Sequence, residues 1–342
     1  MMKLPSIAGH KQKDSSSRCA GGQQGLALLL VLSMITLLVA AVVSFNQAMS
    51  SGYAETNIYK NQSIMRAMTE SGMDIAMAVL HTDGTSNQYD HGFDSWSLLG
   101  EQPIPGEFSQ GVVEAVIVDH DGKFPINALA DEDTPWRDVL YRLLTSGLFV
   151  VEDEVAAREI VDSLADWLDE DDNELPYGAE SGYYLSRENG IEPRNGPFVS
   201  LAELSLVKGV TTELLYGTDE HLGLREVVTI LDTGGTVNLN TVRAPVLMAI
   251  DPRINAEHVE KLEEFRADEN NAPAFSGVSW YRRVSGWPAD IELPGDMLKT
   301  DSQTFTVTVN SRYLGSRMSL IADLVRDSDS SLRIVRRTYR YL

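Results

Sequence analysis

Cysteine is nearly absent from this chain of 342 residues, in which Cys19 is the only one. A single cysteine cannot form an intramolecular disulfide, so the folded part must be stabilised by core packing or by a bound metal. The sequence also lacks a G-x-S-x-G motif and a P-loop, and its six histidines form no H-x-H or H-x-x-x-H pair. Residues 81–91 combine histidine with aspartate, but their Gly, Ser and Asn content indicates a loop after a helix. We therefore predict a protein that is not an enzyme.

Positive charge is scarce as well. The chain has 28 Lys and Arg against 50 Asp and Glu, a formal net charge of -22. Residues 1–25 contribute +3, so the remainder carries -25. Such an excess argues against a nucleic-acid-binding surface and suits a body that faces water or cations. The hydrophobic content of 43% and the chain length together favour a folded protein with a substantial core over a disordered one.

One long apolar run is present, residues 26–43, and it contains no charge. As a helix it would be about 27 Å long, close to the ~30 Å thickness of the hydrocarbon core of a bilayer. Basic residues flank only its N-terminal side, so we expect the segment before it to stay in the cytoplasm and the body to be exported. The run therefore predicts a single-pass membrane protein with an exported C-terminal body.

The helical pattern continues beyond this run. Residues 44–80 contain no proline, and Ile64, Met68, Ile75 and Val79 recur at helical spacing. We therefore expect one helix of about 55 residues, with a bend possible at Ser51-Gly52. Its second half would pack against a globular head.

Gly25 directly precedes the apolar run and follows a basic, polar leader. This arrangement resembles the type IV pilin and pseudopilin class, in which a prepilin peptidase cuts after the glycine. The resemblance implies cleavage between Gly25 and Leu26, with methylation of the new N-terminus as an accompanying expectation. Major pilins carry Glu at the fifth mature position to neutralise a neighbour's N-terminal amine, whereas this chain has Leu30. Because an unpaired charge in a low-dielectric shaft is costly, such a subunit suits the tip of a filament. An uncleaved signal anchor is the alternative.

The head of a pilin is a small antiparallel sheet packed on the long helix. Partly alternating β-branched runs predict strands at residues 112–118, 304–310, 317–326 and 332–342. Helical periodicity between them predicts helices at 136–148, 152–168, 200–207, 244–250 and 255–266. The predicted fold is α+β, a pilin-like long N-terminal helix packed on a small antiparallel sheet that a large inserted α-helical domain interrupts. The expected parts are a leader (1–25), a transmembrane helix (26–43), the pilin-like helix and first strand (44–123), the insert (124–299) and the C-terminal strands (300–342).

The insert contains a weak internal repeat. "FPINALADEDTPWRDVLYRLL" and "TVNLNTVRAPVLMAI" each begin with an apolar-Asn segment, Asn127 in one and Asn238 and Asn240 in the other, and then enter a helix. A second helix and a segment that starts with Phe, "FVSLAELSLVKGV" or "FSGVSWYRRVSG", follow in each case. The pattern resembles tandem helix–hairpin–helix units, which often cradle a DNA phosphate. Phosphate binding needs basic neutralisation, and the first unit is acidic, so we expect packing modules and no nucleic-acid partner.

The stretch "DWLDEDDNELPYGAESGYY" is the most acidic segment of the insert. Asp169, Asp171 and Asn173 occupy positions 1, 3 and 5 of a twelve-residue loop, and Glu180 occupies position 12, which is the ligand spacing of an EF-hand. Position 6 is Glu174 in place of glycine, so a standard EF-hand is not expected. Carboxylates this concentrated repel one another unless a cation or full solvation relieves them. We predict a Ca²⁺ site with Asp169, Asp171 and Glu180 as first ligands and Asp172 and Asn173 next. A solvated acidic loop is the alternative.

Gly25, Leu30, the acidic loop, "FVSLAELSLVKGV" and "VNLNT" together resemble the K-type minor pseudopilins of the type II secretion system over nearly the whole chain. The resemblance implies a single-pass protein of the bacterial inner membrane with its C-terminal body in the periplasm. It also implies a calcium-binding inserted domain and a place at the tip of the periplasmic pseudopilus. There the protein would join the I- and J-type minor pseudopilins, initiate assembly and support export of folded proteins.

Further partners that the resemblance implies are the major pseudopilin, the inner-membrane assembly platform, the prepilin peptidase and secreted cargo. Two alternatives remain at this point. One is a minor pilin of a type IV pilus with an adhesive or DNA-capture role. The other is an anchored periplasmic binding protein.

Overall fold

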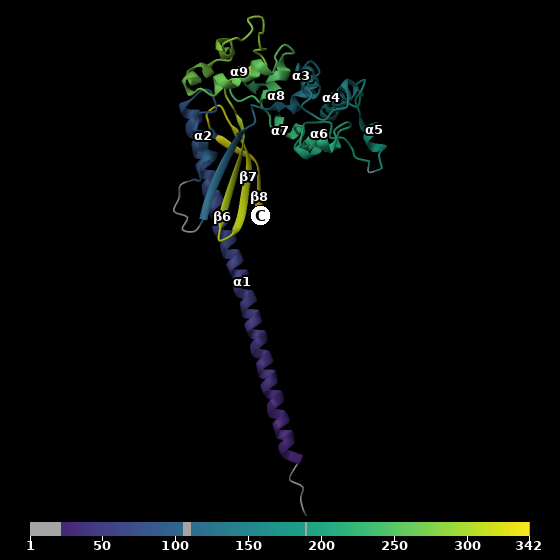
Figure 1. Cartoon of the computed structure of the whole chain (residues 1–342). Helices are drawn as coiled ribbons and strands as arrows, with labels where there is room; N and C mark the ends of the chain where they lie inside the picture. Colours follow the sequence, from purple (N-terminus) through teal and green to yellow (C-terminus); the bar gives the residue numbers. More distant parts are fainter. Residues whose placement is uncertain (1–21, 105–110, 189, 342) are drawn as a thin grey trace, which may run out of the picture. The chain divides into compact units, whose positions relative to one another are not determined.

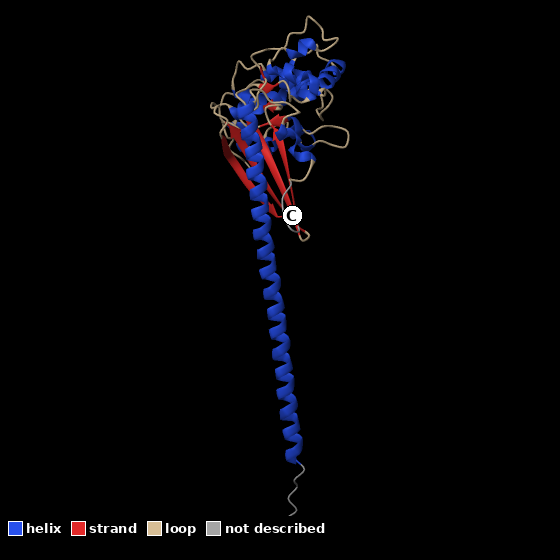
Figure 2. Ribbon diagram, turned by 90° about the vertical axis from the view of Figure 1, so that its left-hand side faces the viewer, coloured by secondary structure: helices blue, strands red, loops and turns tan. Residues whose placement is uncertain are grey.

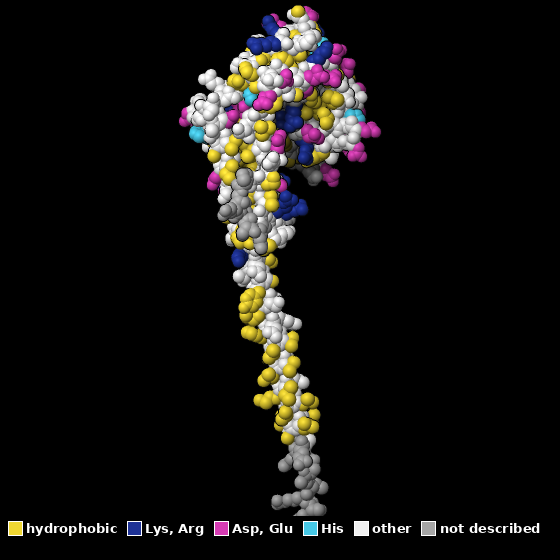
Figure 3. Space-filling model, turned by 60° about the vertical axis from the view of Figure 1, so that its left-hand side comes forward, with side chains coloured by type: hydrophobic (Ala, Val, Ile, Leu, Met, Phe, Trp, Pro, Cys, Tyr) yellow, Lys and Arg dark blue, Asp and Glu magenta, His cyan; other side chains and the backbone are white. Residues whose placement is uncertain are grey.

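The computed structural model describes residues 22–104, 111–188 and 190–341, so most of the expected leader, with Cys19, lies outside the described residues. The chain divides into two compact units, residues 1–62 and 63–342. Helix α1 (Gly22–Ser86) contains a stretch of mean hydropathy 3.0 that is long and apolar enough to cross a membrane. Hydrophobic side chains cover the face of this stretch drawn in Figure 3. The helix is continuous through Ser51 and Gly52, and it reaches Ser86, so half of the loop expected at 81–91 is helical.

A four-stranded antiparallel sheet forms the head of the second unit (Figure 2). Its order is β1 (Gly111–Asp119), β6 (Thr304–Tyr313), β7 (Ser316–Arg326) and β8 (Leu332–Tyr341). The register places Ala115 opposite Val309, and Val309 opposite Leu320. All four strands were expected from the sequence to within a few residues. The predicted pilin-like fold class is therefore confirmed, with a long helix beside a small antiparallel sheet.

Period-two alternation puts one face of this sheet against the second half of α1. Strand residues of that face are buried, and so are Met65, Met68, Met73, Ala76 and Leu80 of the helix. The helix approaches the sheet closely at Gly72, where an added Cβ would lie 2.6 Å from a methyl group of Val309. Ile75, which was expected in the buried stripe, is 37% exposed, because the buried stripe is centred about one position away on the helix.

The insert lies between β1 and β6, which are neighbours in the sheet, and its helices gather at one end of the head (Figure 1). Two short helices precede β1, namely α2 (Ser95–Leu98) and the 3₁₀ helix η1 (Leu99–Glu101). The elements after β1 are, in order, β2 (Phe124–Pro125), η2 (Ile126–Ala130), α3 (Trp136–Leu144), α4 (Glu154–Leu168), α5 (Ser181–Leu185), η3 (Leu201–Leu206), α6 (Thr212–Tyr216), α7 (Leu224–Val227), β3 (Val228–Thr229), β4 (Val237–Asn238), α8 (Ala244–Ile250), α9 (Ala256–Arg266), η4 (Glu269–Ser276), η5 (Trp280–Arg283) and β5 (Leu298–Lys299).

These bounds differ from the expected helices mainly at two places. Helix α3 ends at Leu144, four residues earlier than expected, and Gly147 follows in the left-handed region with φ +78°. The segment expected as a helix at 200–207 is the 3₁₀ helix η3, whose N-cap Ser200 accepts a hydrogen bond from the N–H of Ala202.

The internal repeat is present in three dimensions. Asn127 donates through Nδ2 to the carbonyl of Phe198, and Asn240 donates through Nδ2 to the carbonyl of Phe275. A two-residue strand opens each repeat and pairs in parallel with a strand that closes it, β2 with β3 and β4 with β5. The asparagines quoted from the sequence therefore hold each repeat together through backbone groups of its later segment.

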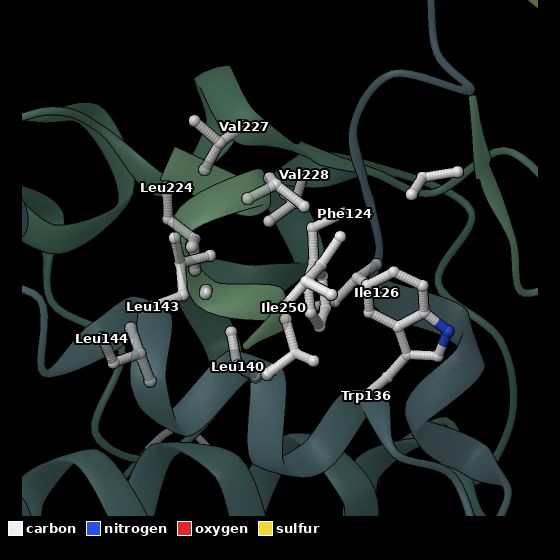
Figure 4. Close-up of a cluster of buried hydrophobic side chains, with 14 of the residues drawn as sticks. Phe124, Ile126, Trp136, Leu140, Leu143, Leu144, Leu224, Val227, Val228 and Ile250 are labelled. Atoms are coloured by element: carbon white, nitrogen blue, oxygen red, sulfur yellow. The ribbon is translucent and has the colours of Figure 1, made fainter. Parts of the chain in front are cut away.

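The core of the insert is apolar. Phe124, Ile126 and Trp136 converge on one another beside Leu140 and Ile250 (Figure 4), and all five side chains are buried. The rings of Phe124 and Trp136 meet edge to face at 5.2 Å. Burial of this cluster is what replaces the missing disulfides as the main source of stability in the insert.

A buried aspartate connects both ends of the insert to the sheet. Asp121 follows β1 and is fully buried. Its Oδ2 accepts hydrogen bonds from the backbone N–H (2.7 Å) and the hydroxyl (2.6 Å) of Thr304, and its Oδ1 forms an ion pair with Lys299. The donors lie at the C-terminal end of the insert and the start of β6, whereas Asp121 lies at the N-terminal end of the insert. This carboxylate therefore holds the two ends of the insert side by side.

Candidate functional site

The acidic loop of the insert runs from the end of α4 to the start of α5. Asp166 lies in the last turn of α4, Asp169 is the C-cap of that helix, and Glu180 is the N-cap residue of α5. The loop returns to its starting point because the carboxylate of Asp166 accepts a hydrogen bond from the N–H of Leu175 at 3.2 Å. Asp162, one turn earlier on α4, likewise accepts the N–H of Tyr177 at 3.1 Å.

This return brings three carboxylates together. Oxygens of Asp166, Asp169 and Glu180 all lie within 4.8 Å of one another, and Asp166 and Glu180 are buried. Both carboxylate oxygens of Glu180 and Oδ1 of Asp169 are buried without a hydrogen-bond partner. Calcium binds carboxylate oxygens at about 2.3–2.6 Å, so oxygens within 4.8 Å of each other fit one coordination sphere.

Burial strongly favours the protonated form of these acids. It raises the pKa of Glu180 to about 8, and the negative charges of Asp166 and Asp169 add to that effect. Burial also raises the pKa of Asp166 to about 6 and the pKa of Asp169 above its ordinary value. When they are ionised, the three groups repel one another, and a bound cation would relieve that repulsion.

No lysine or arginine in the described part of the chain forms an ion pair with any of the three carboxylates. Lys208 is nearby, but its ammonium donates to the carbonyls of Tyr177 (3.3 Å) and Gly178 (3.0 Å). The backbone of the loop also fits tightly around the acids. A Cβ added to Gly178 would lie 1.8 Å from Oδ2 of Asp166, so only glycine leaves room for that carboxylate.

The structure brings together two of the five ligands expected from the sequence, Asp169 and Glu180. The side chains of Asp171, Asp172 and Asn173 are exposed and outside the group of three. Oδ1 of Asp171 accepts the N–H of Asn173 at 2.7 Å, and Oδ1 of Asp172 accepts the N–H of Ser181 at 3.2 Å. Their role as ligands stays a prediction.

Two residues at this site were missed from the sequence. Asp166 precedes the twelve-residue loop and was not among the expected ligands, although helical spacing from Asp169 could have placed it on the same side. Asn195 has a buried Oδ1 without a hydrogen-bond partner, while its Nδ2 donates to the carbonyl of Asp171 at 3.0 Å. No sequence signal connects Asn195 to the loop, because 24 residues separate it from Asp171.

The expected processing residues lie near the start of α1. Gly25, Leu26 and Leu30 are within the helix and exposed. Leu26 is 63% exposed and Leu30 is 67% exposed, as are many apolar neighbours. Cleavage between Gly25 and Leu26 stays a prediction.

Comparisons with known proteins agree with one another. Residues 122–225 match the family model described as type II secretion system (T2SS), protein K. Type II secretion system protein K of Pseudomonas aeruginosa is 26% identical over 341 residues, which cover 92% of each chain. The protein of the same name from Klebsiella pneumoniae is 25% identical and covers 67% of this chain and 71% of its own.

A solved structure has the same fold. A chain in the crystal structure of the GspK-GspI-GspJ complex from the type 2 secretion system of enterotoxigenic Escherichia coli matches with a TM-score of 0.62. The match has 18% identity and covers 84% of this chain and 99% of the other. In its family-model match, its relatives and its fold, the chain is therefore similar to type II secretion system protein K.

Proposed function

We propose that this protein is a minor pseudopilin that caps the tip of the periplasmic pseudopilus, initiates its assembly and supports export of folded proteins. The observation that carries the proposal is the position of the insert at the end of the head where α1 ends. The N–H of Asp90, just beyond α1, donates to the carbonyl of Thr300 near the end of the insert at 2.8 Å. Bulk at this end of the head would obstruct another subunit that stacks above it.

The sequence of the apolar helix also supports a position at the tip. Leu30 is apolar and has no carboxylate to pair with the N-terminal amine of a neighbouring subunit. A buried amine without such a partner is costly in the interior of a filament. A subunit at the tip does not have to make this contact with a subunit above it. The apolar helix would anchor the protein in the inner membrane before assembly, with the body in the periplasm.

We further propose that the partners include I- and J-type minor pseudopilins, because the matching fold was solved in a complex that contains GspI and GspJ. The major pseudopilin, the assembly platform of the inner membrane, the prepilin peptidase and secreted cargo complete the expected set. The net charge of -25 after Gly25 does not favour nucleic acid.

The insert would hold Ca²⁺ through Asp166, Asp169 and Glu180. Bound there, the cation would neutralise the carboxylates and hold the start of α5 against the end of α4. The orphaned oxygens of Glu180 and Asp169 support this assignment, since buried polar atoms are otherwise satisfied in folded proteins.

Two measurements test the proposal. N-terminal sequencing of the membrane-extracted protein, with and without active prepilin peptidase, is expected to give a start at Leu26 only with the enzyme. A gold-labelled tag in the exposed turn at residues 219–220 is then expected at one end of each pseudopilus, whereas a tag on the major pseudopilin should label the whole length. A retained leader would exclude the pilin class, and labels along the filament would contradict a tip position.

A further inference from the structure

A second group of carboxylates lies in the head, outside the insert. Asp83 is on the last turns of α1, and Asp90 and Asp94 are in the segment that follows it. One oxygen from each lies within 4.8 Å of the other two. Their side chains are only 9%, 3% and 6% exposed. Asp83 and Asp90 therefore lie near the two ends of residues 81–91, where the sequence predicted a loop, and Asp94 lies just beyond them.

Arg326 of β7 is the one arginine in the described part of the chain that pairs with this group. Its Nη1 donates to Oδ2 of Asp83 at 3.2 Å, and its Nη2 donates to Oδ2 of Asp90 and to the carbonyl of Ser302. The N–H of Ser302 also donates to Oδ2 of Asp90 at 2.7 Å. Arg326 therefore binds one oxygen of each of two carboxylates.

One buried oxygen is left over. Oδ1 of Asp90 has no hydrogen-bond partner, although Asp90 is 2% exposed and its carboxyl group lies against that of Asp83. Asp90 and Arg326 line an open cavity of about 410 Å³, and Asp83 lines a second cavity of about 420 Å³. A small ion can therefore reach the group from solvent.

The charges of this group do not balance. Three carboxylates face one guanidinium, and His91 lies 3.3 Å from Asp94 as a further titratable neighbour. With His91 neutral, the group carries a net charge of about -2 when all three acids are ionised. Burial and the charges of Asp94 and Asp90 raise the pKa of Asp83 to about 7. A proton would therefore compete with a bound cation for this group of carboxylates.

We propose that Asp83, Asp90 and Asp94 bind one divalent cation of the calcium class, which ties the end of α1 to the segment that leads into the sheet. All three donors are carboxylate oxygens, which are among the oxygen ligands that hard cations prefer. The bare oxygen of Asp90 is the group that needs the ion most. Arg326 repels a cation, so this site is expected to bind more weakly than the one in the insert. The site is independent of the proposed role in secretion.

The test uses terbium in place of calcium on the full chain in detergent. The Glu180→Gln variant serves as parent, because it weakens the insert site. The indole of Trp96 lies beside Asp94, so a bound terbium ion there would be sensitised by this tryptophan. We expect saturable terbium luminescence that calcium displaces, and loss of most of the signal when Trp96→Phe is added. Asp90→Asn should weaken binding by about tenfold or more.

Matched controls keep the result decisive. Asp83→Asn leaves the pair between Arg326 and Asp90 in place, so it reports on the site if Asp90→Asn does not fold. Asp327→Asn removes an exposed acid from the rim of the same cavity and should bind as the parent does. Absence of saturable binding in the parent, or equal binding in the parent, Asp83→Asn and Asp327→Asn variants, would overturn the proposal and leave a shared proton at Asp83 and Asp90.

Discussion

The two carboxylate clusters of this protein differ in what the fold places against them. In the insert, Asp166, Asp169 and Glu180 lie against one another, a backbone N–H donates to Asp166, and the ammonium of Lys208 binds carbonyls instead. In the head, Asp83 and Asp90 share the guanidinium of Arg326. The first cluster is left almost wholly uncompensated by the described chain, and the second is compensated in part.

The two clusters therefore differ in how much they depend on a bound cation. Salt screens a buried ion pair much less than an exposed one, so Arg326 gives this cluster a positive partner whether or not calcium is present. A cluster without a cation is stable only when an ion or protons are supplied, so the insert depends on its surroundings. Calcium dependence should therefore be strong in the insert and weak in the head.

The largest expected effect comes from removing the guanidinium of Arg326, which pairs with Asp83 and Asp90 in the head. Arg326→Gln would leave the buried Asp83 and Asp90 without a positive partner, at a cost of about 3–5 kcal/mol in the free energy of unfolding. Urea unfolding in chelator measures this loss, with Arg333→Gln on exposed β8 as the control. A loss below about 1 kcal/mol would show that the two clusters are less different than their contacts suggest.

Calcium removal is the matching change for the insert. At a concentration about 100 times its Kd, a ligand adds about 2.7 kcal/mol to the free energy of unfolding, so chelation should lower Tm clearly in the parent protein. Glu180→Gln should abolish most of this response. In chelator, the variant should be at least as stable as the parent, because one repelling charge is gone. An equal calcium response in both proteins would contradict the assignment of Glu180.

The pH dependence sharpens the same comparison. The folded-state pKa of Glu180 is raised from 4.5 to about 8, so the native state binds its proton more tightly than the unfolded state does. The contribution of Glu180 to stability in chelator should therefore be fully present below about pH 4.5 and be lost as pH rises toward 8, by at most about 1.4 kcal/mol per pH unit. Calcium should reduce this fall, and Glu180→Gln should flatten it. A slope that Glu180→Gln leaves unchanged would assign the proton elsewhere.

The smallest effect is expected at the exposed rim of the insert site. Asp171→Ala removes the hydrogen bond to the N–H of Asn173 and should lower stability by about 0.5–1 kcal/mol. Differential scanning calorimetry in excess calcium measures the change, with Glu170→Ala at an exposed neighbour as the control. An unchanged Tm would show that this hydrogen bond does not stabilise the loop, and it would count against Asp171 as a calcium ligand.

The sequence predicted the elements well where periodicity was strong. Burial alternates along β1 and β6, and helix α8 was expected with the bounds that it has. Periodicity was less informative on α1, where Met65, Met73 and Leu80 are buried in addition to Met68. Apolar residues surround much of that helix, so the pattern by itself did not decide which side faces the sheet.

In the internal repeat, too, the sequence identified residues but not their contacts. Asn127 and Asn240 were found from their position before a helix, but their partners were not. Each side chain binds the backbone of a phenylalanine, and 71 residues separate the first pair while 35 separate the second. Every residue has a backbone carbonyl, so the type of the residue that accepts these hydrogen bonds does not identify it as the partner.

By itself, the sequence determined the long apolar helix, the place of the insert between two strands and the acidic loop, because these depend on local composition and period. Only the tertiary structure decided which acids meet. Asp166 joins the site because the loop folds back on α4, and Asp83 meets Asp90 and Arg326 because α1 packs on a sheet whose third strand lies over 200 residues away in the chain. Charge clusters of this kind arise from the folded path of the backbone, which spacing along the sequence does not encode.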